Sequence, residues 1–373
     1  MKKNCNIGVV TFPISEAGNF SLFNLAKVLY SLSGKIYLIS DIQGQDPFEN
    51  DANIVSFYRV THKSQKKLLL RELSYFYTQL KIVFIMLRLT KNVDLWVFFH
   101  GGDGLIIPIA IAKLLRKKVV LISAASGLRM AQASNDPLQR YFSISQNITY
   151  GLANQIVLYS TRLIYENNLQ KYRSKIIIAA QHYIDLGVFK IIKPFCERDN
   201  LVGYIGRFSE EKGIVEFVKA IPRTLIKDNE IDFIIGGDGK LRSKIEKNLN
   251  ENDLNTKVKL LGWISHHNLP QYLNECKLII LPSFTEGLPS IILEAMACGT
   301  PVLATPVGAI LDYIKDGETG FIMENNSPEC IAGNIIRALN HPNLKQIAEN
   351  GRKVVEKEFT FEKAVESYKN IVG

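Results

Sequence analysis

Short apolar runs alternate with amphipathic stretches along this 373-residue chain. In the first half, the apolar runs predict strands at residues 6–11, 36–40, 95–99, 119–123, 155–159 and 175–179. Stretches with helical spacing of their apolar residues lie between them, for example at residues 21–32 and 106–115. This alternation predicts an α/β fold in which helices cover both faces of a parallel sheet.

A second series of the same kind follows a break near residues 185–199, which contain Pro194 and mixed charge. Its strands are predicted at residues 201–205, 232–235, 258–261, 277–281, 301–304 and 320–323, and its helices at 213–225, 241–249, 269–275 and 328–339. The chain is also too long for one ordinary core. We therefore predict two doubly wound domains, at residues 1–188 and 189–360. Since ligands of such sheets bind beyond the carboxyl ends of the strands, we expect a site in a cleft between the domains.

The composition is that of a folded protein with an anionic partner: 47% of the residues are apolar, 22% are charged and the net charge is +9. The five cysteines are scattered without a CxxC pair, which disfavours a zinc site or a disulfide framework and fits a reducing compartment. The sequence shows no signal-peptide pattern, and no run approaches the roughly 20 apolar residues of a spanning helix. We expect a cytoplasmic protein, or one peripheral on the cytoplasmic face of a membrane.

Two carboxylates, Glu286 and Glu294, flank a Gly-Leu-Pro-Ser turn and the start of a helix that Gly299 ends. A loop-to-helix junction aims N–H groups and a positive dipole end at an anion, and carboxylates accept hydrogen bonds from sugar hydroxyls. The segment therefore predicts a site for a phosphate and a sugar. The alternative is structural, because a Glu one turn into a helix also complements its dipole. The residues of the turn are Gly287, Leu288, Pro289 and Ser290.

A loop with two cations follows the first strand of the second half. Gly206 lets the backbone turn tightly, and Arg207 and Lys212 together suit a diphosphate. The alternative is a basic loop that forms surface ion pairs with its two neighbouring glutamates. A Gly-rich turn that includes Gly237 follows the next strand, although such turns often only reverse the chain.

These motifs occur in the order seen in retaining glycosyltransferases of family 4, which the chain resembles over roughly residues 200–325. The resemblance rests on residues 206–213, 237–239, 286–294, 299–302, 306–308 and 316–321. The family has the GT-B fold, in which two Rossmann-like domains face each other across a cleft. The resemblance implies an N-terminal acceptor-binding domain and a C-terminal donor-binding domain, with the last helix, at residues 361–373, packed back on the N-terminal domain.

The resemblance also implies a reaction: a sugar passes from a nucleotide diphosphate sugar to a glycan or a lipid-linked acceptor, with retention of configuration. Arg207 and Lys212 would grip the donor diphosphate. Glu294 would bond the ribose, and Glu286 would lie by the transferred sugar beside the N–H groups of residues 287–290. Since the sequence contains no Asp-x-Asp pair, these cations and the helix end, rather than a metal, would stabilise the leaving group. No cofactor is expected.

The N-terminal half departs from the family pattern and offers weaker candidates for contact with the acceptor or the sugar. They are Gly18, Asn19, His100, Ser126 and Arg129. A purely structural turn explains Gly18, Asn19 and His100 equally well. Residues 62–91 are basic and aromatic-rich with Glu72 as their one acidic residue, which is typical of a helix on an anionic membrane. A core-packing helix with a solvated outer face is the alternative.

Three other functions fit parts of the sequence. An epimerase of the same fold would isomerise the nucleotide sugar without an acceptor. A catalytically silent relative would only bind nucleotide as a partner subunit; the lack of a His or Asp at residues 121–129 favours it, and the intact donor motifs argue against it. Nucleic-acid binding rests on charge alone, without an aromatic platform or recognition motif, so no nucleic-acid partner is expected.

Overall fold

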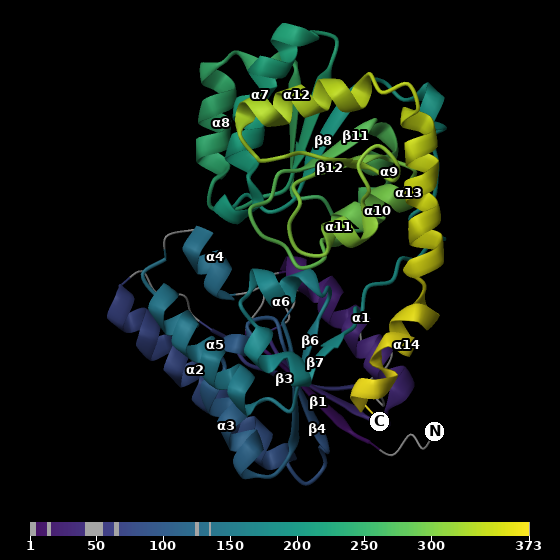
Figure 1. Ribbon diagram of the computed structural model, residues 1–373. Helices are drawn as coiled ribbons and strands as arrows, with labels where there is room; N and C mark the ends of the chain where they lie inside the picture. The colour runs from purple at the N-terminus through teal and green to yellow at the C-terminus, as the bar shows by residue number, and fades with distance from the viewer. Residues whose placement is uncertain are drawn as a thin grey trace. The chain divides into compact units, whose positions relative to one another are not determined.

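The computed structural model describes residues 5–12, 16–41, 55–62, 67–123, 127–133 and 136–372. The chain divides into two compact units (Figure 1). Unit 1 consists of Met1–Tyr183 together with Phe361–Gly373, and unit 2 consists of Ile184–Thr360. The division after Tyr183 lies a few residues before the boundary that the sequence suggested, and the last helix belongs to unit 1.

Unit 1 is built on a parallel sheet. Among the described residues, seven strands pair in the order β3-β2-β1-β4-β5-β6-β7. They are β1 (Ile7–Thr11), β2 (Ile36–Ser40), β3 (Val55–Arg59), β4 (Leu95–Phe99), β5 (Lys118–Ile122), β6 (Gln155–Leu158) and β7 (Ile176–Ile178). The sequence did not predict the edge strand β3, because Ser56 and Arg59 interrupt its apolar run.

Helices cover both faces of this sheet (Figure 1). They are α1 (Glu16–Leu32), α2 (Leu68–Leu89), α3 (Ile106–Leu114), α4 (Gly127–Ala133), α5 (Gln139–Leu152), α6 (Arg162–Glu166) and α14 (Phe361–Val372). α1 and α14 pack side by side although they come from opposite ends of the chain. The Tyr368 hydroxyl bonds the side-chain oxygen of Gln181 at 3.3 Å, and the Lys118 ammonium donates to the carbonyl of Ile371 at 2.9 Å. These contacts tie α14 to unit 1.

Unit 2 repeats the architecture. Within the part of the chain that the structure describes, six parallel strands pair in the order β10-β9-β8-β11-β12-β13. They are β8 (Leu201–Ile205), β9 (Asp232–Gly236), β10 (Val258–Gly262), β11 (Leu278–Leu281), β12 (Val302–Ala304) and β13 (Phe321–Ile322). The helices are α7 (Ile214–Lys227), α8 (Arg242–Glu251), α9 (Leu269–Glu275), α10 (Ser290–Ala297), α11 (Ile310–Tyr313), α12 (Pro328–Leu339) and α13 (Leu344–Glu358).

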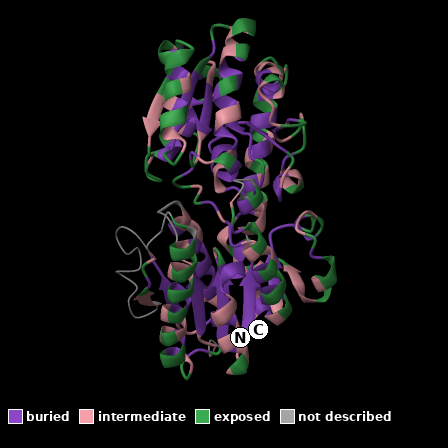
Figure 2. Cartoon of the chain, turned by 90° about the vertical axis from the view of Figure 1, so that its left-hand side faces the viewer, coloured by how far each residue is buried: buried purple, intermediate pink, exposed green. Residues whose placement is uncertain are grey.

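The prediction of two Rossmann-like, doubly wound domains is confirmed. In both sheets the strands are largely buried, and exposed residues belong mainly to helices and loops (Figure 2). The strand order reverses once in each sheet, between β1 and β4 in unit 1 and between β8 and β11 in unit 2. At such a switch point the two following loops run to opposite sides of the sheet and leave a crevice for a ligand. The cleft predicted between the domains stays a prediction.

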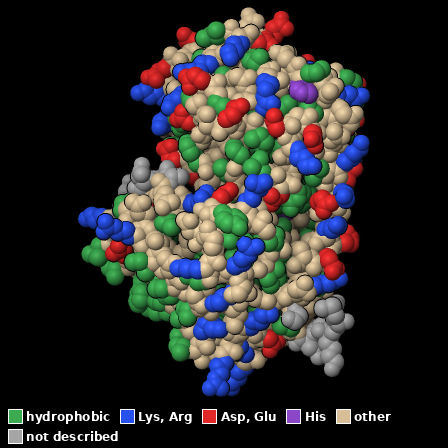
Figure 3. Space-filling view, viewed as in Figure 1, with side chains coloured by type: hydrophobic (Ala, Val, Ile, Leu, Met, Phe, Trp, Pro, Cys, Tyr) green, Lys and Arg blue, Asp and Glu red, His purple; other side chains and the backbone are tan. Residues whose placement is uncertain are grey.

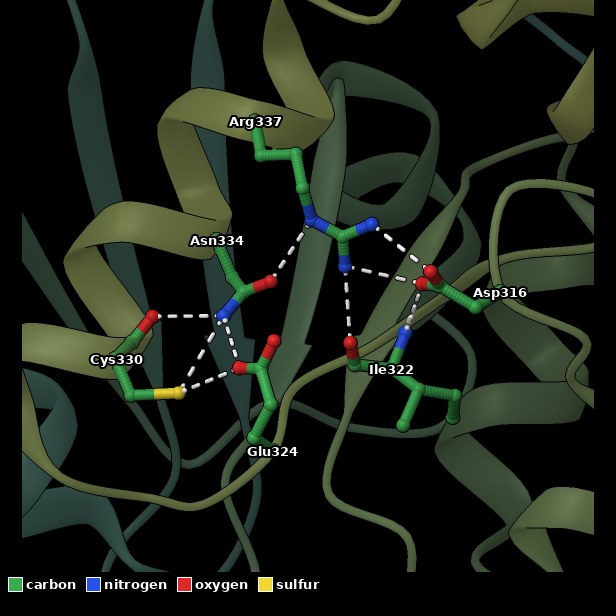
Figure 4. A network of polar contacts seen from close by, with 6 residues as sticks. All are labelled: Asp316, Ile322, Glu324, Cys330, Asn334 and Arg337. Carbon is green, nitrogen blue, oxygen red and sulfur yellow. Dashed lines mark hydrogen bonds and ion pairs between the residues drawn. The ribbon is translucent and has the colours of Figure 1, made fainter.

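A polar network joins α12 to the chain around the edge strand β13 (Figure 4). Asp316 accepts two hydrogen bonds from the guanidinium of Arg337, at 2.9 and 3.0 Å. Glu324 accepts from the Cys330 thiol at 3.1 Å and from the Asn334 amide at 3.0 Å. These contacts, the thiol bond first, lower the pKa of Glu324 to about 2.

We expect Glu324→Gln to destabilise the protein near neutral pH but not in strong acid. A carboxyl whose pKa is lower in the folded than in the unfolded state stabilises the fold above its unfolded pKa of about 4.3. That contribution is lost as the pH falls through the folded pKa, which for Glu324 is about 2. Urea titrations at several pH values should show the free-energy difference between wild type and variant shrinking from about pH 4 to about pH 2. A constant difference would contradict this expectation.

Candidate functional site

The candidate site of unit 2 lies at the switch point of its sheet, where β8 and β11 end side by side. The loops that follow these strands are in direct contact, because the N–H of Phe284 donates to the carbonyl of Glu211 at 2.9 Å. Gly213, just before α7, has a φ of +66°, and a Cβ there would lie 1.9 Å from the carbonyl oxygen of Pro282. The missing side chain of Gly213 therefore allows the two loops to approach.

Lys212 and Glu286, one from each loop, form an ion pair. The Nζ of Lys212 lies 2.6 Å from Oε1 of Glu286, and the Ser283 hydroxyl donates to the same oxygen at 2.7 Å. The Glu286 side chain is 8% exposed and that of Lys212 is 21% exposed. The pair therefore fixes a partly accessible ammonium group beyond the carboxyl ends of β8 and β11, where an anionic ligand is expected.

Arg207 forms an ion pair within its own loop. Its guanidinium lies 2.8 Å from Oε1 of Glu211, and the Ser209 hydroxyl donates to that oxygen at 2.6 Å. Burial acts to raise the pKa of Glu211, but these two contacts outweigh it and hold the pKa below its ordinary value. Arg207 thus forms the ion pair with a neighbouring glutamate that the structural alternative describes, whereas Lys212 pairs with a residue of the other loop. The Arg207 side chain is still 43% exposed.

Glu294 lies on α10 and is paired with a histidine that the sequence did not single out. The Nε2 of His266 is 3.0 Å from Oε1 of Glu294, whose side chain is 5% exposed. The His266 ring packs against Phe189 with 5.1 Å between ring centroids. The one sequence signal for His266 was its place in the loop just after β10, at a strand's carboxyl end. Its partner, 28 residues further along the chain, could not be foreseen.

The turn before α10 is held by the loop after β12. Gly308 has a φ of +62°, and a Cβ there would lie 2.4 Å from the carbonyl oxygen of Glu286. The N–H of Ala309 donates to the carbonyl of Gly287 at 2.8 Å. Of the turn residues, Gly287, Leu288 and Pro289 are buried, and Ser290, the first residue of α10, is partly exposed. Since the first N–H groups of a helix lack intrahelical acceptors, this end of α10 can bind an anion.

Two glycines bring the ends of β8 and β9 together. Gly237 has a φ of +135°, and a Cβ there would lie 1.9 Å from the carbonyl oxygen of Gly206. The N–H of Gly206 donates to the carbonyl of Gly236 at 3.0 Å, and that of Gly237 donates to the carbonyl of Gly262 at 2.7 Å. The loops after β8, β9 and β10 therefore form one continuous backbone surface beside Arg207.

The N-terminal candidates have structural partners in unit 1. Gly18 and Asn19 lie in the first turn of α1, which begins at Glu16 instead of at residue 21 as expected, and Asn19 is buried. His100 has a φ of +37°, and its Nε2 lies 3.0 Å from the Ser21 hydroxyl. Arg129 forms an ion pair with Glu166 at 3.2 Å. Ser126 lies outside the described residues, so its role stays a prediction.

Unit 1 also contains a cavity of about 650 Å³ that sequence reasoning missed. Its apolar lining includes Phe12, Tyr75, Phe76, Leu138, Tyr141 and Phe142, and its polar lining includes His62, Arg71, Glu72 and Gln79. The cavity starts where β1 and β4 end, because Phe12 and Gly101 follow these strands. Burial, and then the charges of Arg71 and Lys81, lower the pKa of His62. The site can thus take a ligand with apolar faces and a few hydroxyl groups.

The two units, each with a switch point in its sheet, define the GT-B fold of glycosyltransferases. Among solved structures, HepE of Anabaena in complex with UDP and glucose is similar over 98% of this chain and 98% of its own, with a TM-score of 0.76 and 15% identity. TarM is similar over 99% of this chain and 99% of its own, with a TM-score of 0.73 and 14% identity. At such identities the likeness concerns the fold. Residues 189–354 match the family described as glycosyl transferases group 1.

Curated relatives match mainly the same region. An uncharacterized glycosyltransferase of Methanocaldococcus jannaschii is 34% identical over 163 residues, which are 43% of this chain and 44% of that protein. The alpha-D-kanosaminyltransferase of Streptomyces kanamyceticus is 32% identical over 40% of this chain and 39% of its own length. The chain thus spans less than half the length of these two relatives. The N-acetyl-alpha-D-glucosaminyl L-malate synthase of Bacillus anthracis is 25% identical over 75% of this chain and 74% of its own.

Proposed function

We propose that the protein is a retaining, metal-independent glycosyltransferase that takes its sugar from a nucleotide diphosphate sugar. The observation that carries the proposal is the ion pair between Lys212 and Glu286 at the switch point of unit 2, beside the N-terminus of α10. The arrangement offers a cation and a helix end to a diphosphate and a carboxylate to a sugar. The match of residues 189–354 to the family described as glycosyl transferases group 1, and the likeness to an alpha-D-kanosaminyltransferase, support it.

In the proposed reaction the bond between the anomeric carbon and the diphosphate oxygen breaks, and the acceptor oxygen bonds that carbon on the same face. The acceptor proton passes to the departing diphosphate. Negative charge grows on the leaving group, and Lys212, Arg207 and the N-terminus of α10 stabilise it. Glu286 accepts hydrogen bonds from the sugar, and Glu294, held by His266, accepts them from the ribose.

The acceptor is assigned to unit 1, as a glycan or a lipid-linked sugar in the synthesis of a cell-surface polysaccharide or glycoconjugate. The cavity lined by Tyr75, Tyr141 and Phe142 supports this assignment, because aromatic rings cover the apolar faces of a sugar while Gln79 and His62 bond its hydroxyls. We also infer that the protein works at the cytoplasmic face of a membrane, since basic and apolar residues share α2.

A thermal-shift panel of UDP-, GDP- and ADP-sugars, each with and without a chelator, tests the donor proposal. One donor should raise the melting temperature by mass action in both conditions. Arg207→Ala and Glu294→Ala should each weaken its binding roughly tenfold or more, because a charge-assisted hydrogen bond is lost. Unchanged affinity in both variants, or binding only when a divalent metal is added, would overturn the assignment. Donor incubated alone should stay unchanged, since isomerised sugar would indicate an epimerase.

A further inference from the structure

The outer face of α2 exposes a continuous apolar stripe. Its members recur every three or four residues and therefore lie on one side of the helix; they are Leu69, Leu73, Phe76, Leu80, Phe84 and Leu87. Their exposed fractions lie between 42% and 68%. Figure 3 shows hydrophobic side chains gathered over α2 on this face of the molecule. An exposed patch of this length marks an interaction surface, because such residues are normally buried or scattered singly.

The stripe is not the side of α2 that packs against the core of unit 1. The opposite side of α2 packs inward through Ile82, Met86 and Leu89, which are buried. Gln79 fixes the helix further, since its side-chain oxygen accepts from the N–H of Ile107 at 3.0 Å and so holds the first turn of α3. α2 is thus anchored on unit 1 with its apolar stripe facing outward.

Basic side chains border the stripe. Lys81 lies with its Nζ 4.6 Å from the centre of the Tyr77 ring, and the Arg88 guanidinium lies 4.0 Å from the centre of the Phe84 ring. Lys67 and Lys91, at either end of α2, are exposed. The one acidic residue of the helix is Glu72. Apolar side chains flanked by cations over aromatic rings suit a lipid interface, where the rings enter and the cations reach the head groups.

We propose that this face of α2 docks the protein on an anionic lipid bilayer. The proposal rests on the membrane placement in the proposed function, and it adds which side of α2 contacts the lipid and which charge that lipid carries. Among the described residues, no helix has the length and apolar content needed to cross a bilayer. α2 would therefore lie along the head groups. Phe76 belongs both to the stripe and to the wall of the cavity, so a docked protein holds that cavity beside the lipid.

Co-sedimentation with vesicles of neutral phosphatidylcholine, alone or mixed with anionic phosphatidylglycerol, tests the proposal on the full chain. Wild type should bind the anionic vesicles at least about tenfold more strongly than the neutral ones, and added salt should weaken binding. The triple variant Leu73→Gln, Leu80→Gln, Phe84→Gln should lose at least about tenfold in partitioning. Lys81→Gln with Arg88→Gln should lose roughly tenfold on anionic vesicles only.

Leu114→Gln is the matched control, because Leu114 is 77% exposed at the end of α3 but lies outside the stripe. It should bind vesicles as wild type does. Absence of vesicle binding, or equal binding by the triple variant, would overturn the proposal. So would a stripe-dependent dimer in sedimentation velocity without vesicle binding, which would assign the face to a second copy of the chain. The rise in melting temperature with the sugar donor, measured on the same samples, keeps the two proposals separate, since vesicle binding needs no donor.

Discussion

Replacing Lys212 by Met should lower transferase activity roughly a thousandfold, because the diphosphate loses a fixed cation as it departs. The variant should also lose about 1–3 kcal/mol of folding free energy. The reason is that Glu286, only 8% exposed, would lose the ammonium group that lies 2.6 Å away. Product formation and urea unfolding measure the two effects.

The double variant Lys212→Met, Glu286→Gln separates catalysis from structure. It removes both charges of the pair, so most of the lost stability should return while activity and donor affinity stay low. Lys219→Met is the matched control, since Lys219 pairs with Glu216 on the surface of α7 at 3.0 Å and should leave both properties unchanged. A stable double variant with full activity would show that the pair is only structural.

Gly213→Ala should cost about 3 kcal/mol of folding free energy and weaken donor binding with it. The φ of +66° is strained for any side chain, and the new Cβ would lie 1.9 Å from the backbone oxygen of Pro282. Relief of this clash requires the loop after β8 to move away from the loop after β11. That movement would separate Lys212 from Glu286.

Gly317→Ala is the control for backbone strain alone. Gly317 has a similar φ of +72°, but a Cβ there would meet no atom of the described residues within 4 Å. The Gly317→Ala variant should lose only about 1 kcal/mol of folding free energy and keep its affinity for the donor. Urea unfolding and donor titration of both variants test the comparison, and equal losses would exclude the loop contact as the cause.

Much of the fold was predictable from local patterns. The apolar runs of β1, β4 and β11 are short and continuous because parallel strands covered on both faces are buried throughout. The edge strand β3 lacks such a run and was missed. The first turn of α1 was also missed, since glycine and asparagine near residue 18 have low helix propensity and suggested a loop.

The sequence by itself determined two doubly wound domains and the loops that carry Arg207, Lys212, Glu286 and Glu294, because strand ends, glycines and caps are local signals. Only the tertiary structure decided that Lys212 pairs with Glu286 and that Glu294 pairs with His266. It also decided that the apolar stripe of α2 faces outward. The pairings and the orientation of α2 depend on which residues that are distant in the sequence come into contact. The spacing of residues along the chain does not contain that information.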